Sequence, residues 1–186
     1  MVGQGFQEAC NYSLRSGNEI EEWNGNIEIG KLALDNPLTS DHTHVRASLL
    51  PGLVENLSHN QKNFNDLTRF FETGRVFVPG PRGNVECISI AFASFAKPNS
   101  RQWKPREELD FFKLKNQLQR VLHACGLNQP KGLWKSISGQ APWQSDYYAK
   151  LGDCHQNKLE LSIGILDLQL TKKKEAKGPI FAGEIL

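Results

Sequence analysis

Several segments of the chain alternate apolar residues with polar or small ones at a period of two. Along residues 85–95, one face carries Ile88, Ile90 and Phe92, and the other carries Cys87, Ser89, Ala91 and Ala93. Residues 27–34 also alternate well, and residues 159–165 repeat the pattern. Alternation of this kind predicts antiparallel β-strands with at least one wetter face.

The remaining strand signals are aromatic and β-branched runs separated by turn residues. Residues 67–78 are rich in such side chains, with Gly74 in their middle, and residues 79–84 supply proline and glycine for a turn. Residues 180–186 form another apolar run that reaches the end of the sequence. Together these segments predict a β-meander.

Helical spacing is clearest from 111 to 125, where leucines and other apolar residues recur every three or four positions. Asp110 can cap the start of this helix, and Gly126 can end it with a positive φ. A second helix is predicted from Leu50–Pro51 to about Asn60, and shorter turns at 18–23 and 171–177. An antiparallel sheet flanked by helices, in the α+β class, is the predicted fold.

Composition fits one folded domain of 186 residues, with 39% hydrophobic and 23% charged residues. The net charge of +2 does not by itself indicate a nucleic-acid partner. No apolar run approaches the roughly 20 residues of a membrane span, and no signal peptide opens the chain. We therefore expect a cytoplasmic protein with no membrane partner.

Because the apolar pattern runs up to both ends of the sequence, we also expect residues 1–186 to be a single module of a longer chain, with its C-terminal strand truncated.

Motifs of self-contained catalysis are missing from the sequence. There is no nucleophile elbow, no phosphate-binding loop and no C-x-x-C pair among the four cysteines. His42 and His44 lie two apart without a third ligand nearby, so we predict no metal site.

Basic and aromatic residues interleave in two short segments, which is one way to bind RNA. The same segments are also typical of a solvated loop and a solvated helix face, which is the simpler interpretation. The residues concerned are Trp103, Lys104 and Arg106 within 101–106, and Lys172, Lys173 and Lys174.

A more specific pattern lies in separated blocks spread over the chain. They read GFQEACNYS at 5–13, NPLTS at 36–40, RASLLPGL at 46–53 followed by Asn60, RFFETGRVF at 69–77 and DFFKLK at 110–115. In this order and spacing the chain resembles the β subunit of bacterial-type phenylalanyl-tRNA synthetase, in the module similar to a class II synthetase catalytic core.

The resemblance implies a class II fold in a subunit whose partner, the α subunit, holds the active site of an (αβ)₂ heterotetramer. That enzyme activates phenylalanine with ATP and esterifies it to its tRNA. ATP and Mg²⁺ would belong to the assembled enzyme, with no cofactor in this fragment. It also implies further domains before and after this one.

Class II enzymes use a Phe-Arg-x-Glu pattern on a strand to hold the ATP phosphates. In this chain the most similar segment is Arg69-Phe70-Phe71-Glu72, in which the arginine and the glutamate are one residue further apart. Because strand side chains alternate, Arg69 and Glu72 are predicted to point to opposite faces and cannot act as a pair. We therefore predict a non-catalytic copy that serves as an assembly module.

The block at 46–53 resembles the region that class II folds use for dimerisation. We expect an interface with the α subunit there, and expect aspartate at Leu49 and Leu53 to weaken assembly without unfolding the module. For Arg46, Glu72 and Arg75, the alternative is that they form salt bridges or cap turns inside the sheet edge. The predicted interface residues are Arg46, Leu49, Leu50, Leu53, Glu72 and Arg75. Two other functions stay open: a tRNA-contacting module that uses the two basic segments, and slow residual turnover of ATP or an amino acid.

Overall fold

The computed structural model describes residues 1–25, 27–63, 68–81, 83–96, 110–124, 126, 135–136, 140–151 and 160–186. Helices and strands alternate along these segments without a long helical block. In chain order they are η1 (Val2–Gln4), β1 (Gln7–Glu8), β2 (Leu14–Arg15), α1 (Gly17–Asn24), η2 (Ile29–Leu32), β3 (His44–Val45), α2 (Leu50–Lys62), β4 (Arg69–Gly80), β5 (Gly83–Phe95), α3 (Phe111–Ala124), β6 (Lys135–Ser136), β7 (Trp143–Leu151), β8 (Leu161–Leu166), α4 (Leu168–Lys173) and β9 (Ile180–Ile185).

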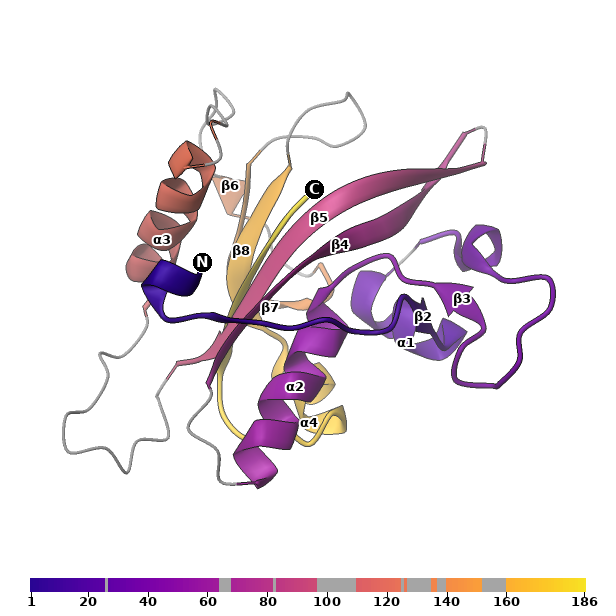
Figure 1. Cartoon of the computed structure of the whole chain (residues 1–186), viewed down its shortest axis with the longest axis horizontal. Coiled ribbons are helices and arrows are strands. Elements are labelled where there is room, and N and C mark those ends of the chain that lie inside the picture. The colour runs from indigo at the N-terminus through magenta and orange to yellow at the C-terminus, as the bar shows by residue number, and fades with distance from the viewer. Residues whose placement is uncertain are drawn as a thin grey trace.

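A seven-stranded sheet forms the centre of the molecule, in the order β1-β4-β5-β9-β8-β7-β6 (Figure 1). Its neighbours pair antiparallel, except that β1 runs parallel to β4. The last strand, β9, lies between β5 and β8 and holds the two halves of the sheet together. A small second sheet pairs β2 with β3 beside α1.

Helices cover both faces of the sheet. On one face, Leu53 and Leu57 of α2 pack with Ala91 and Ala93 of β5. On the other face, leucines of α3 pack with Phe92 of β5 and with residues of β8 and β9. All six residues of β9 are buried, so the expectation of a wetter face is wrong for the centre of the sheet. The α+β class and the flanking helices are confirmed.

The predicted helices form close to their expected bounds. In α3 the Oδ1 atom of Asp110 accepts a hydrogen bond from the Lys113 N–H at 2.8 Å, and Gly126 follows with a φ of 70°. α1 and α2 each extend only slightly past the predicted segments. α4 begins earlier than predicted because Asp167 caps its first turn by accepting from Gln169 and Leu170.

One local prediction is wrong. The segment 27–34 is not a strand: Ile29–Leu32 forms a 3₁₀ turn, and its apolar residues pack against Ile20 of α1 and Ala47. The turn predicted within 79–84 is confirmed, because β4 and β5 form an antiparallel hairpin whose last pair is Gly80 with Gly83. In the described part of the chain, no helix is long and apolar enough to span a membrane.

Candidate functional site

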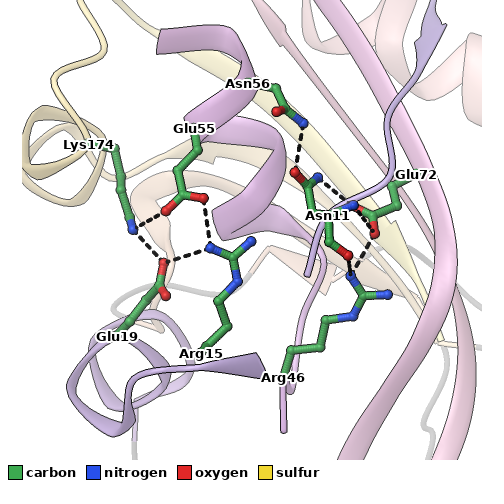
Figure 2. Close-up of polar contacts among 8 residues, drawn as sticks. All are labelled: Asn11, Arg15, Glu19, Arg46, Glu55, Asn56, Glu72 and Lys174. Carbon is green, nitrogen blue, oxygen red and sulfur yellow. Dashed lines mark hydrogen bonds and ion pairs between the residues drawn. The ribbon is translucent and has the colours of Figure 1, made fainter. Parts of the chain in front are cut away.

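A buried ion pair lies between α2 and the sheet. The Nη1 atom of Arg46 is 2.6 Å from Oε1 of Glu72 on β4, and the two side chains are 6% and 2% exposed (Figure 2). The Nε–H of Arg46 also donates to the carbonyl oxygen of Arg75 at 2.9 Å. A guanidinium and a carboxylate removed from water need such additional hydrogen bonds to offset the loss of hydration.

Asn11 completes the surroundings of this pair. Its Nδ2 donates to Oε2 of Glu72 at 2.7 Å, and its backbone N–H donates to Oε1 at 3.3 Å. Its own Oδ1 accepts from Asn56 of α2 at 3.1 Å, as Figure 2 shows. Both carboxylate oxygens of Glu72 therefore already have donors from this chain. In the sequence, the only signal for Asn11 is its place in the block at 5–13.

Gly74 lets the guanidinium of Arg46 lie directly against β4. A Cβ atom at this position would collide with Nη2 of Arg46 and would come 3.5 Å from Leu49. The glycine in the middle of the strand is thus a close-approach position for a side chain from another element.

Arg69 and Glu72 belong to opposite faces of β4, as the alternation predicts. The neighbouring aromatic residues mark the faces, because Phe70 packs in the α2 core and Phe71 packs in the α3 core. Glu72 shares the face of Phe70 and Arg69 shares that of Phe71. The two side chains therefore cannot act together on one ligand.

A second buried carboxylate, Glu184 of β9, lies near Arg46. It accepts hydrogen bonds from the Ser48 hydroxyl at 2.7 Å, the Leu49 N–H at 2.9 Å and the Ser89 hydroxyl at 3.0 Å. Burial raises the pKa of Glu184, although these three donors and the charge of Arg46 oppose the rise. The central strand is thereby tied to the start of α2.

The six predicted interface residues are not all on the surface. Leu49, Leu50 and Leu53 are at most 1% exposed and belong to this chain's own core. This corrects the expectation that they face a partner and that aspartate there would leave the fold intact. Arg46 and Glu72 are also buried, and they form a salt bridge with each other, as the alternative interpretation predicts. Arg75 is 71% exposed and pairs with Glu86 at 3.1 Å across the hairpin.

A polar cleft of about 570 Å³ opens on the same side of the sheet as α2. Four charges meet in it: Glu55 lies 2.7 Å from Arg15 and 2.6 Å from Lys174, and Glu19 lies 2.5 Å from Lys174 (Figure 2). Burial alone would raise the pKa of Glu55, but hydrogen bonds from Arg15 and Lys174 lower it. Burial would likewise lower the pKa of Lys174, and its two carboxylate partners raise it. The cleft is lined by Cys10, Asn11, Tyr12, Leu14, Arg15, Ser16, Glu19, Asp41, His42, Glu55 and Lys174.

The two basic segments predicted to contact RNA have different outcomes. Trp103, Lys104 and Arg106 lie outside the described residues. Lys173 pairs with Glu22 at 2.6 Å, and Lys174 is held by Glu19 and Glu55. Lys172 is exposed and has no ion pair within the described segments. Two of the three lysines are therefore paired with carboxylates of this chain.

The two histidines of the 42–44 segment have separate surroundings. His44 Nδ1 is 2.7 Å from the Thr43 hydroxyl, and the ring of His42 lies 5.6 Å from that of Tyr12. Among the residues that the structure describes, no group of three or more His, Cys, Asp or Glu side chains is placed to hold a metal ion. Cys10 and Cys87 are free thiols; Cys125 and Cys154 lie outside the described part.

Comparison with known proteins gives one consistent family. Residues 1–185 match the model of the phenylalanyl tRNA synthetase beta chain CLM domain. The whole chain is 31% identical to the phenylalanine–tRNA ligase beta subunit of Buchnera aphidicola subsp. Acyrthosiphon pisum and 33% identical to that of Pseudomonas savastanoi pv. phaseolicola. In each case the chain covers 23% of the relative's length.

The fold also resembles solved class II structures. A pyrrolysyl-tRNA synthetase from Desulfitobacterium hafniense superposes with a TM-score of 0.66 at 16% sequence identity. The match covers 98% of this chain and 60% of that one. At this identity the likeness shows a shared fold, which is that of a class II synthetase core.

Proposed function

Because the chain belongs to the family of phenylalanyl-tRNA synthetase β chains, we propose that it is a non-catalytic assembly module of phenylalanine–tRNA ligase. In this role it supports the α subunit, which attaches phenylalanine to its tRNA at the expense of ATP. We further propose that both subunits work in the cytoplasm as an (αβ)₂ heterotetramer.

The observation that carries the non-catalytic role is the closed environment of Glu72. A carboxylate that helps to bind ATP has to face the substrate together with a cation on the same face of the strand. Glu72 instead points between α2 and the sheet, where Arg46 and Asn11 occupy both of its oxygens. Arg69 is on the other face. Residues 69–72 therefore have a structural role inside this chain and do not form an ATP-binding pair.

The neighbouring residues do not fit a nucleotide or Mg²⁺ either. Magnesium takes oxygen ligands, most often from carboxylates together with substrate phosphates. The carboxylates at this place, Glu72 and Glu184, are 2% and 7% exposed and accept hydrogen bonds from protein groups. Leucines of α2 fill the space above the sheet beside them. We propose that ATP and Mg²⁺ bind only to the α subunit of the assembled enzyme.

We place the contact with the α subunit on the outer half of the β4–β5 hairpin. Ile88, the partner of Arg75 in the pairing of the two strands, is 73% exposed. This hairpin reaches out past the other strands (Figure 1). An exposed isoleucine flanked by the Arg75–Glu86 pair combines an apolar centre with a charged rim, as protein interfaces do. Arg46, Glu72 and the three leucines then act indirectly, by fixing β4 against α2.

A tRNA contact is the second candidate. Engagement of Lys173 and Lys174 with Glu22, Glu19 and Glu55 leaves less free positive charge on α4 than the sequence indicated. Neutralising Lys172, Lys173 and Lys174 together is therefore expected to leave tRNA binding by the chain unchanged. A steep salt-dependent affinity for tRNA that this triple variant abolishes would favour the RNA-contact role instead.

ATP–pyrophosphate exchange with phenylalanine tests the non-catalytic role. The chain alone is expected to give no exchange above a blank, and Glu72→Gln is expected to leave the exchange of the chain mixed with α subunit unchanged, provided that the variant is folded. Exchange by the chain alone would show instead that the module retains an active site. Assembly itself is tested by sedimentation of the chain together with the α subunit.

A further inference from the structure

The mouth of the polar cleft, formed by its exposed lining residues Tyr12 and Asp41, takes no part in the contact proposed for the β4–β5 hairpin. Tyr12 stands at this mouth with 79% of its surface exposed, and its ring contacts that of His42 at a centroid distance of 5.6 Å and an angle of 36°. A tyrosine this exposed gains little from burial in its own chain. Its flat face is available to a group from outside.

The charges lining the cleft do not cancel. Three carboxylates, those of Glu19, Glu55 and Asp41, face two cations, Arg15 and Lys174. The inner four are paired with one another at distances of 2.5 to 2.7 Å. Asp41, at the exposed end, has only the Ser40 hydroxyl at 3.4 Å among the hydrogen bonds and ion pairs of the described residues. The excess negative charge is therefore at the mouth, beside the aromatic pair.

An aromatic face next to an unpaired carboxylate is the combination that binds an arginine side chain. The guanidinium is planar, stacks on aromatic rings and pairs with carboxylates through its forked N–H groups. A phosphate would be repelled by Asp41 and Glu55. A free carboxylate ligand would find Arg15 and Lys174 already engaged.

We propose that the cleft receives an arginine side chain of the α subunit, which stacks on Tyr12 and pairs with Asp41. This inference rests on the proposed function, since the α subunit is the partner assigned there. Tyrosine and arginine are the residue types most often found to dominate binding energy in protein interfaces, which agrees with an anchor of this kind.

The test is the dissociation constant of the chain with the α subunit from the same organism, measured at low and high salt. Tyr12→Ala is expected to weaken binding by about 3- to 30-fold, the range given by a cation–π contact. Tyr12→Phe keeps the aromatic face and is expected to bind as the unaltered chain does. Asp41→Asn is expected to weaken binding about fivefold at low salt, and by less at high salt.

Two matched controls separate this contact from a general loss of surface. Phe112 is 76% exposed on α3, which covers the other face of the sheet. Glu21 is an exposed carboxylate of α1 outside the cleft lining. Phe112→Ala and Glu21→Gln are expected to change nothing. Loss of affinity with these controls as large as with Tyr12→Ala overturns the inference.

Photo-cross-linking from position 12 identifies the occupant. With benzoylphenylalanine in place of Tyr12, the expected product is an adduct with an arginine-containing peptide of the α subunit. An adduct with tRNA or with this chain itself overturns the inference. The inference is also overturned if the complex forms and its dissociation constant is unchanged by both Tyr12→Ala and Asp41→Asn. In that case the proposed function stands. If the unaltered chain forms no complex at all, the proposed function fails and the inference fails with it.

Discussion

The guanidinium of Arg46 and the carboxylate of Glu72 form an ion pair inside the molecule, 2.6 Å apart and almost fully removed from solvent. The pair joins the segment before α2 to β4, across 26 residues of sequence. Its charges cost hydration energy, which the hydrogen bonds from Asn11 and to the Arg75 carbonyl help to offset.

Breaking this pair from one side is therefore expected to be costly. Arg46→Met or Glu72→Leu alone should lower the free energy of unfolding by about 3–5 kcal/mol, because each leaves a buried charge without its partner. The double variant should lose less than the sum of the two. Urea unfolding measures all three. Arg75→Ala, which breaks an exposed pair, should cost less than about 1 kcal/mol. Strict additivity of the two buried substitutions would show that they do not interact.

Leu53 should be essential to folding. It is 0% exposed on α2, so Leu53→Ala is expected to lower the free energy of unfolding by about 2–5 kcal/mol. Leu53→Asp should prevent folding, because it would bury an unpaired charge. Circular dichroism and urea unfolding report both effects. Leu38→Ala, at a position 97% exposed, is the control and should change stability by no more than about 0.5 kcal/mol. A folded Leu53→Asp chain would contradict the packing described for α2.

Glu184 should give the module a recognisable dependence on pH. Its pKa is raised in the folded chain, mainly by burial. A raised pKa means that the group's favourable contribution is complete below its unfolded pKa of about 4.3 and is lost as the pH rises through the folded value. The stability of the unaltered chain relative to Glu184→Gln should therefore fall as the pH rises from 4.5 toward 8. Urea unfolding of both chains over that range tests this, and a difference that grows with pH would refute it.

Removing the charge of Lys174 in the cleft should affect the stability of the chain, whereas removing that of Lys172 on α4 should not. Lys174→Met breaks ion pairs to two carboxylates, of which Glu19 is largely buried and Glu55 partly exposed, and should destabilise the chain by about 1 kcal/mol. The loss should shrink in high salt, because salt screens partly exposed pairs. Lys172→Met removes a neighbouring charge with no ion pair in the described part and should have no measurable effect. Equal effects of the two substitutions in urea unfolding would mean that the cluster does not stabilise the chain.

Much of the fold could be predicted from local pattern. β5 and α3 carry strong periodic signals of two and of about 3.6 residues, and Asp110 and Gly126 mark the ends of the helix. The 3₁₀ turn at Ile29–Leu32 could not be predicted this way, because its apolar residues alternate like a strand while packing against another element. Periodicity indicates which residues will be buried, but it does not determine whether a strand or a helical turn places them in the core.

The site was less accessible to sequence reasoning. Alternation correctly separated Arg69 from Glu72, since that inference needs only the geometry of one strand. It did not reveal that Arg46 and Asn11 surround Glu72, because those contacts depend on how three distant segments fold together. Nor can a pattern distinguish a leucine buried by its own chain from one buried by a partner, which is why Leu49, Leu50 and Leu53 were assigned to the surface.

Sedimentation velocity of this chain mixed with the α subunit of phenylalanyl-tRNA synthetase from the same organism tests the assembly role most directly. We expect a complex that sediments faster than either component. Ile88→Asp, at a position 73% exposed, should weaken the complex without lowering the stability of the chain. If the folded chain and the α subunit sediment independently at concentrations well above those of the cell, the assembly role is contradicted.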